Sequence, residues 1–197
     1  MKRVLATSII LLAADQLLKF WVKTNMFLHQ EYVIFDWFSI LFVENKGVAF
    51  GALNEIGDLG KIILSSFRII VVIWGISYLY NLTKKTLPNG LLVSLGLVLG
   101  GAIGNIIDGV FYGVLFSKSD NTQIAEFLPS NGGYETLLQG SVVDMFYFPL
   151  ISTHFPNWLP FFGGEHFIFF RPVFNIADAG ISVGMFMLIL FYRKHFR

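Results

Sequence analysis

Four stretches of mainly apolar residues, each long enough to cross a lipid bilayer as a helix, divide this chain. They cover residues 4–22, 62–82, 90–111 and 173–192. A spanning helix needs about 20 such residues. Charged residues make up only 14% of the 197 residues, which is about half the share usual in soluble domains, so they are too few to cover a water-soluble particle. The sequence therefore predicts an all-α membrane protein with four transmembrane helices, in a single domain over residues 1–197.

Basic residues near the ends of the spans predict the orientation of the helices. They form three clusters, before the first span, between the second and third, and after the fourth: Lys2, Arg3, Lys84, Lys85, Arg193, Lys194 and Arg197. Such clusters favour the cytoplasmic side. We therefore expect both termini in the cytoplasm and the long connections 23–61 and 112–172 outside. The apolar start of the chain is interpreted as a retained helix, because Asp15, Gln16 and Lys19 interrupt the region where a signal peptide would be cleaved.

The two long connections differ in composition. Residues 23–61 hold short apolar stretches separated by glycines, a pattern that predicts a small extracytoplasmic β-sheet. The second connection begins with a polar stretch, 117–139, and continues with an aromatic stretch, 145–170. Because aromatic rings favour the membrane–water interface, we expect the aromatic stretch to lie there as a helix or loop.

Polar side chains inside the spans gather near the outer end of each helix. At a rise of 1.5 Å per residue, all lie within roughly 12 Å of that end. They are Asp15, Arg68, Asn105, Asp108, Asn175 and Asp178. Ionisable groups in a bilayer usually face a bundle interior or a water-filled site, so their common depth predicts a functional site. Polar contacts between helices would also explain them, and Asp15 and Lys19 have the i,i+4 spacing of an ion pair.

Asp144 stands in an apolar part of the second connection, where a charge needs a partner or a proton. If this part returns to the bundle, Asp144 can face Asp178. Two carboxylates in a poorly hydrated site share a proton, so one acts as a base toward water and the other donates to a carbonyl. This is the chemistry of an aspartic hydrolase, and it requires no metal and no cofactor. Either aspartate can be the base.

Other functional signals are weaker. Residues 180–184 match G-x-S-x-G, but they lie inside a span and not at a strand-to-helix turn. The chain has no cysteine, its four histidines lack the spacing of a zinc protease, and its net charge of +1 predicts no nucleic-acid binding. Two alternatives stay open: a scaffold, and a small carrier or channel subunit that uses Asp15, Arg68 and Asp108 as a relay. Polar groups at a single depth give the relay no continuous path.

Five blocks of the sequence resemble the lipoprotein signal peptidase (signal peptidase II) family. They are DQLLK (15–19), VENKGVAFG (43–51), GGAIGNIID (100–108), VVDMF (142–146) and FNIAD (174–178). The resemblance implies an aspartyl endopeptidase that removes the signal peptide of diacylglyceryl-modified prolipoproteins before the lipidated cysteine. It implies a multi-pass protein of the bacterial cytoplasmic (inner) membrane with an extracytoplasmic active site. The implied partners are the lipid-modified prolipoprotein and membrane lipids, and we expect a monomer.

The resemblance also implies roles for individual residues. Asp144 and Asp178 match the catalytic pair. The matching residues that would support the site or bind substrate are Asp15, Lys19, Asn45, Gly47, Ala49, Asn105, Asp108, Asn175 and Ala177. The family usually has arginine after the aspartate of the third block, where this chain has Gly109, and we expect Arg68 or Arg171 to substitute. The link between the third and fourth blocks is longer than usual in the family, so residues 117–139 are interpreted as an insertion.

Overall fold

The computed structural model describes residues 1–46, 57–158 and 160–196. In this part of the chain, four helices are long and apolar enough to cross a membrane. They are α1 (Lys2–Asn25), α2 (Gly57–Leu82), α3 (Asn89–Ile107) with its continuations η3 (Asp108–Tyr112) and α4 (Gly113–Leu115), and α5 (Ile176–Met187) with its continuations η4 (Leu188–Tyr192) and η5 (Arg193–Phe196). The prediction of four apolar helices of spanning length is therefore confirmed.

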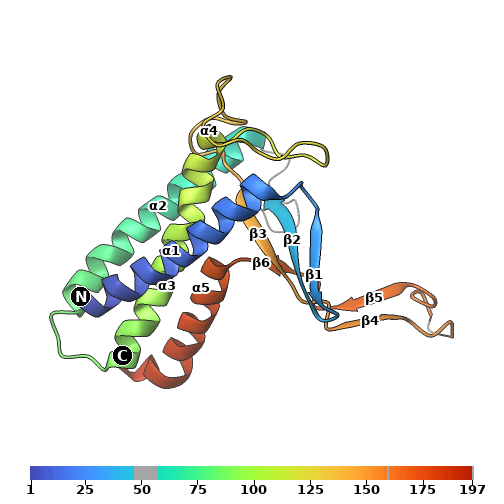
Figure 1. Cartoon of the computed structure of the whole chain (residues 1–197). Coiled ribbons are helices and arrows are strands. Elements are labelled where there is room, and N and C mark those ends of the chain that lie inside the picture. The colour runs from blue at the N-terminus through green and yellow to red at the C-terminus, as the bar shows by residue number, and fades with distance from the viewer. Residues whose placement is uncertain (47–56, 159, 197) are drawn as a thin grey trace.

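Helix α3 occupies the centre of the bundle and contacts α1, α2 and α5 (Figure 1). Glycines make these contacts close: a Cβ atom added at Gly100 would lie 2.8 Å from the carbonyl oxygen of Ser8 on α1. On the other side of α3, Gly101 lies directly against the backbone of Ala177 on α5. Small residues let helix backbones approach in this way inside a membrane. The two ends of the chain lie near each other, at the end of the bundle opposite the sheet (Figure 1).

A four-stranded antiparallel sheet covers one end of the bundle. Its strands are β1 (Glu31–Phe35), β2 (Phe38–Asn45), β3 (Val142–Tyr147) and β6 (Val173–Phe174), in the order β1-β2-β3-β6. We expected a sheet formed by the first long connection alone. That connection supplies β1 and β2, whereas β3 and β6 come from the part of the chain after residue 140. The strand β3 contacts both α1 and η3, so it joins the sheet to the helices.

The fourth span begins later than expected. Val173 and Phe174, which we assigned to this helix, form the strand β6 and pair with β3. Helix α5 begins only after Asn175, because the side chain of this residue accepts a hydrogen bond from the backbone N–H of Asp178 at 2.9 Å and forms the N-cap. The strand and the helix thus meet at a single capping residue.

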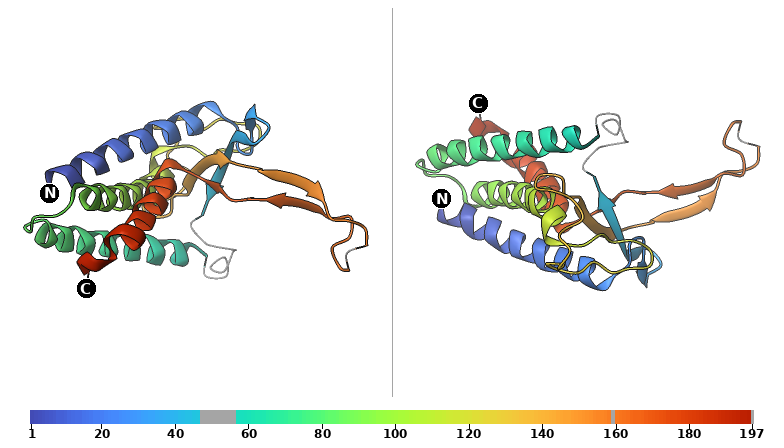
Figure 2. Two further views of the ribbon diagram at one scale, coloured as in Figure 1. Left: turned by 90° about the horizontal axis from the view of Figure 1, so that it is seen from below. Right: turned by 90° about the horizontal axis from the view of Figure 1, so that it is seen from above.

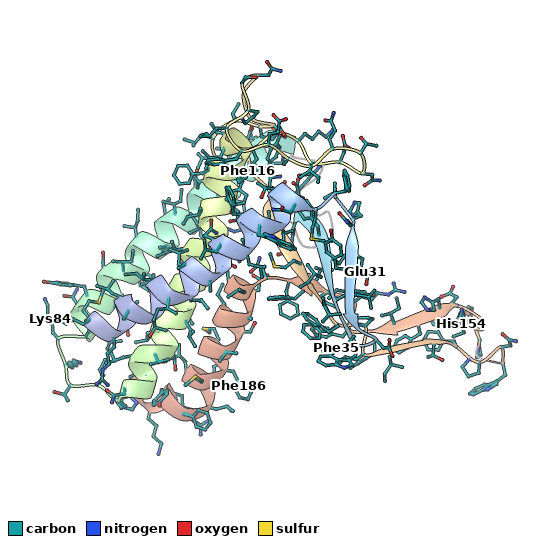
Figure 3. All side chains as sticks on the ribbon, in the orientation of Figure 1. Glu31, Phe35, Lys84, Phe116, His154 and Phe186 are labelled. Atoms are coloured by element: carbon teal, nitrogen blue, oxygen red, sulfur yellow. The ribbon has the colours of Figure 1, made fainter. Side chains whose placement is uncertain are left out.

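The aromatic stretch 145–170 does not form an interfacial helix in its described residues. It contains a separate two-stranded hairpin, β4 (Ile151–His154) and β5 (His166–Phe169). Pairing between the two strands satisfies the backbone polar groups that face the partner strand. The hairpin extends away from the helices (Figure 2), and His154 marks its distant part (Figure 3). Its position at a membrane interface stays a prediction.

The polar stretch 117–139 packs on the end of α1 that lies next to the sheet. Phe20 of α1 makes edge contacts with the rings of Phe116 and Phe127, at centroid distances of 5.7 and 5.2 Å. The backbone N–H of Leu28 donates to the carbonyl of Asp120 at 3.1 Å. Phe116, labelled in Figure 3, belongs to a buried apolar cluster with residues of α1, β2 and β3. This stretch is therefore part of the packed structure.

Candidate active site

A cavity of about 420 Å³ lies between α2, α3, α5 and the strands β2 and β3. Its lining residues are Asn45, Arg68, Val71, Val72, Ala102, Asn105, Ile106, Val142, Asp144, Asp178 and Ile181. The two aspartates that the sequence singles out therefore share one cavity. Antiparallel pairing of β3 with β6, which directly precedes α5, brings them together.

Asp144 is held by two asparagine side chains. In the sheet it pairs with Val43 of β2, two residues before Asn45. The Nδ2 atom of Asn45 donates to Oδ2 of Asp144 at 3.2 Å, and Nδ2 of Asn175 donates to Oδ1 at 2.7 Å. The Asp144 residue is only 2% exposed. Its carboxyl group thus has a fixed orientation at the edge of the cavity.

Asp178 is held from α3 and from the start of its own helix. Nδ2 of Asn105 donates to Oδ1 of Asp178 at 2.7 Å. The backbone N–H of Asn175 makes a longer contact, 3.5 Å, with Oδ2 and completes a capping box. Nδ2 of Asn175 also lies 3.1 Å from Oδ1 of Asn105. The two asparagines therefore link both aspartates into one hydrogen-bonded unit.

A buried ionic cluster lies behind this unit. Nζ of Lys19 is 2.9 Å from a carboxylate oxygen of Asp15 and 2.9 Å from one of Asp108, which confirms the expected pairing of Asp15 with Lys19. Lys19 also donates to Oδ1 of Asn105 at 2.9 Å. The three charged side chains are at most 1% exposed. Removing one partner from such a buried set leaves an uncompensated charge, so the cluster is expected to act as a unit.

Each acid of the cluster also holds the backbone next to one aspartate of the cavity. Oδ1 of Asp15 accepts from the N–H of Ala177 at 2.9 Å, directly before Asp178. Oδ2 of Asp108 accepts from the N–H of Val143 at 3.1 Å, directly before Asp144. Through its two carboxylate partners, a single lysine therefore positions the main chain at both aspartates.

Gln16 joins the cluster, and we did not single it out from the sequence. Its Nε2 atom donates to Oδ1 of Asp108 at 2.9 Å, and its Oε1 atom accepts from the hydroxyl of Tyr112 at 3.2 Å. The sequence feature that could have pointed to Gln16 is its position next to Asp15, on the helix that carries Lys19.

Two of the predicted supporting residues, Gly47 and Ala49, lie outside the described residues.

Of the two arginines considered as substitutes at Gly109, the structure brings Arg68 to the cavity. Arg68 is close enough to Asp178 for the opposite charges to attract. With Ser65 and Gly109 it also lines a small space beside the cavity. Arg171 is exposed instead, after β5, where Nη2 donates to the carbonyl of His166 at 3.3 Å. Arg68 is therefore the arginine whose position relates to the two aspartates.

Burial and the neighbouring charge of Asp178 raise the pKa of the Asp144 carboxyl to about 7. Hydrogen bonds from Asn45 and Asn175 act in the opposite direction. Near neutral pH, Asp144 can therefore carry a proton, as expected for one of two close carboxylates that share a proton. Such a pair can activate water and protonate a carbonyl oxygen.

A second buried lysine was also missed. Lys23 forms an ion pair with Glu44 of β2 and donates to the hydroxyl of Ser119 at 3.0 Å. Aromatic rings surround its ammonium group, at 4.8 to 5.9 Å from their centroids: Phe42, Phe116 and Tyr134. The signal in the sequence was the repeated spacing of four residues from Asp15 to Lys19 and on to Lys23, which places all three on one face of α1.

Most of the chain is similar to known signal peptidases. Residues 7–193 match the model of the family described as Signal peptidase (SPase) II. The chain is 53% identical to the lipoprotein signal peptidase of Porphyromonas gingivalis over 194 residues, which cover 98% of this chain and 84% of that protein. It is 35% identical to the lipoprotein signal peptidase of Amoebophilus asiaticus over 181 residues, which cover 89% and 71% of the two chains.

The fold is also similar to that of solved bacterial membrane enzymes. One, determined at 2.3 Å resolution, has a TM-score of 0.59 at 19% identity, with 98% of this chain and 89% of that chain covered. Another, determined at 1.9 Å resolution, has a TM-score of 0.60 at 21% identity, with 96% and 92% covered. These likenesses concern the fold, whereas the family match extends over nearly the whole sequence. The chain therefore belongs to the signal peptidase II family.

Proposed function

We propose that this protein is an aspartic endopeptidase that cleaves the signal peptide from diacylglyceryl-modified prolipoproteins, directly before the lipidated cysteine. Its membership of the signal peptidase II family supports a prolipoprotein substrate. The observation that carries the assignment of residues is the meeting of Asp144 and Asp178 in one cavity. The whole chain would then act as one peptidase domain, as a monomer among membrane lipids.

The proposed chemistry uses the two carboxyl groups as an acid and a base. The ionised aspartate takes a proton from a water molecule, whose oxygen bonds to the carbon of the scissile amide. The protonated aspartate donates its proton to the carbonyl oxygen, which gives a neutral diol intermediate. Proton transfer to the amide nitrogen then accompanies cleavage of the C–N bond. The products are the carboxylic acid of the signal peptide and the free amino group of the lipidated cysteine.

The asparagines would keep the two acids in position during this cycle. Asn105 and Asn175 donate to Asp178 and Asp144 at 2.7 Å each, so neither carboxyl group must reorient when a proton moves. Asn45 reaches Asp144 from the sheet. We propose that the sheet holds the extended substrate beside the cavity, as the edge of a sheet commonly does with a peptide.

We further propose that the cavity lies toward the extracytoplasmic side of the bacterial cytoplasmic membrane, with both termini in the cytoplasm. The three basic clusters support this orientation, because they lie at the two chain ends and in the connection between α2 and α3. The cavity is near the opposite end of the bundle, where the sheet lies. A substrate anchored by its lipid in the outer leaflet would present its scissile bond at that level.

The proposed function is tested with Asp144→Asn and Asp178→Asn. Each variant removes one acid but keeps the size of the side chain, so cleavage of a lipidated precursor should fall at least about a hundredfold. Purified protein in detergent is incubated with lipidated and unlipidated precursor, and the products are separated by mass. The matched control is Asp120→Asn, because Asp120 is an acid on the 117–139 stretch, bonded to Thr122 and away from the cavity.

The control variant should cleave the lipidated precursor like the wild type. Wild-type cleavage of the unlipidated precursor at an equal rate would contradict the proposed substrate. Full activity of either variant at the cavity would contradict the assignment of the pair.

A further inference from the structure

The two aspartates of the cavity differ in the charges around them. Among the described residues, Asp178 attracts Arg68 of α2, which lines the same cavity. Asp144 accepts hydrogen bonds from two neutral amides, Asn45 and Asn175. The cation that acts on it, Lys19, is itself paired with two carboxylates. A cation beside one member of a carboxyl pair stabilises negative charge on that member. The surroundings therefore distinguish two residues that the sequence leaves equivalent.

We propose that Arg68 fixes the roles of the pair: it keeps Asp178 as the carboxylate that takes a proton from water, so that the shared proton stays on Asp144. This inference rests on the proposed peptidase function and adds the direction of proton transfer to it. Arg68 acts through Asp178 and is a positioning residue in this scheme.

The other charged groups around the pair include one cation, Lys19, whose charge favours the ionised form of Asp144 and so acts against this direction. The charged groups that face the pair or its asparagines from the packed helices are Asp15 and Lys19 on α1, Arg68 on α2 and Asp108 on α3. The charge of Lys19 is matched by two carboxylates, each 2.9 Å away. Arg68 lies on the cavity side, whereas Lys19 lies behind Asn105. Among the described residues that line the cavity, Arg68 is the one with a positively charged side chain.

The hydrogen bonds at the two carboxyl groups agree with this division of roles. Oδ1 of Asp178 accepts from Asn105 at 2.7 Å, whereas Oδ2 has the longer contact of 3.5 Å with the backbone nitrogen of Asn175. Oδ2 is thus the more available oxygen for a water proton. In Asp144, Oδ1 has the short bond to Asn175 at 2.7 Å and Oδ2 the longer bond at 3.2 Å to Asn45. The proton that Asp144 donates would sit on its Oδ2.

The proton balance of the reaction follows from this assignment. Water gives one proton to Asp178 as its oxygen bonds to the amide carbon, and Asp144 gives its proton to the carbonyl oxygen. When the C–N bond breaks, the proton on Asp178 passes to the leaving nitrogen. A proton from the diol returns to Asp144 as the carbonyl re-forms, so the pair regains its initial state.

The test measures kcat/KM against pH for Arg68→Gln, Arg68→Lys and Arg171→Gln, because this profile reports the essential acid and base of the free enzyme. Arg68→Gln removes the positive charge that, in this scheme, stabilises the carboxylate acting as base. The acidic limb of the Arg68→Gln profile should therefore move up by about one pH unit, with about tenfold lower activity on that limb. Arg68→Lys keeps a charge and should stay close to the wild-type profile. Arg171→Gln, the matched control, removes an exposed arginine and should leave the profile unchanged.

A grafted arginine provides a second test. A Cβ atom at Gly109 would meet only the hydroxyl oxygen of Ser65 among described atoms within 4 Å, at 3.6 Å, an ordinary contact. Gly109 and Arg68 line the same small space. The space is too narrow for a water molecule while Arg68 is present, so the graft is combined with the shorter side chain of Arg68→Gln. In the double variant Arg68→Gln/Gly109→Arg, the new guanidinium would start from η3, next to the position that Arg68 leaves. The acidic limb should move back toward the wild-type position.

The outcomes separate this inference from the proposed function. Arg68→Gln with a wild-type profile would overturn the role of Arg68, even if both aspartates prove essential. A folded double variant that keeps the Arg68→Gln profile would also count against it. Full activity of Asp144→Asn or Asp178→Asn would instead overturn the proposed pair itself. Membrane insertion and thermal unfolding in detergent check that each variant is folded.

Discussion

Two lysines on α1, four residues apart and fully buried, belong to two regions with different tasks. Lys19 lies between α1 and α3, where it pairs with Asp15 and Asp108. Lys23 lies one turn further along, where Glu44, Ser119 and three aromatic rings surround it. The first region holds the main chain at the two aspartates of the cavity. The second holds the sheet and the 117–139 stretch on the bundle.

The two sites show two ways in which this protein stabilises a buried ammonium group. At Lys19 the charge is matched by acids that each also accept a backbone N–H, so a change there reaches the candidate catalytic residues directly. At Lys23 one acid and a set of ring faces suffice, since cation–π contacts stabilise a desolvated ammonium. Lys23 connects to the cavity through β2, where its partner Glu44 precedes Asn45. Variants at the two lysines and their neighbours therefore test this division between the two regions.

The largest effect is expected for Lys19→Met. This change leaves Asp15 and Asp108 buried without their cation, and buried acids that lose their partner cost about 3–5 kcal/mol. The backbone at Val143 and Ala177 should shift with them. We therefore expect cleavage of the lipidated precursor to fall at least about a hundredfold, with a lower unfolding temperature in detergent. Near wild-type cleavage by Lys19→Met would contradict the positioning role of this cluster.

Most of the Lys19 region could be predicted from the sequence because its partners belong to short, local patterns. Asp15 and Lys19 have i,i+4 spacing on a span, and Asn105 with Asp108 and Asn175 with Asp178 have i,i+3 spacing at one depth. Polar side chains at one depth of apolar spans are expected to contact one another, because the lipid around them offers no hydrogen-bond partners. The same constraint, applied to length and hydropathy, predicts the four helices.

The Lys23 region could not be predicted in this way, because its contacts join distant parts of the chain. Lys23 and Ser119 are separated by 96 positions, and the pairing of β2 with β3 has no local signal in either segment. The strand β6 was missed since two residues are too few to show an alternating pattern. The hairpin β4–β5 was missed because aromatic residues favour both strands and membrane interfaces.

The next effect in size concerns pH and separates the two regions. If Asp144 is the proton donor, activity requires its protonated form. With a pKa of about 7, the donor is lost as the pH rises above that value, and cleavage should fall about tenfold per pH unit. The midpoint is read from kcat/KM measured across the pH range. In Lys23→Met it should stay near the wild-type value, since Lys23 pairs with Glu44 and not with Asp144. A large shift of the midpoint in Lys23→Met would show that the two regions are not independent.

A smaller effect on catalysis, with a clear effect on stability, is expected for Lys23→Met. The partly buried carboxylate of Glu44 would lose its partner, so the free energy of unfolding should fall, by about 3 kcal/mol at most. Cleavage should stay within about fivefold of the wild type, because the aspartates keep their own supports. The double variant Lys23→Met/Glu44→Met should regain much of the stability, since replacing both charges by apolar groups removes the unpaired acid. Thermal unfolding in detergent measures both variants, and a double variant no more stable than Lys23→Met would contradict this account.

The smallest effect is expected for Tyr112→Phe, at the edge of the Lys19 region. The hydroxyl of Tyr112 donates to Oε1 of Gln16 at 3.2 Å, and its loss should lower the free energy of unfolding by about 1 kcal/mol. Gln16 still donates to Asp108 at 2.9 Å, so the ionic cluster keeps its shape and cleavage should change less than about twofold.

The variant for comparison is Tyr134→Phe in the Lys23 region, where the hydroxyl accepts from the buried N–H of Ser141 at 2.7 Å. That change leaves a buried donor without its partner and should cost about 1–3 kcal/mol, again with little effect on cleavage. A loss of cleavage in Tyr112→Phe comparable to that of Lys19→Met would mean that the cluster depends on its outer hydrogen bonds as much as on its charges.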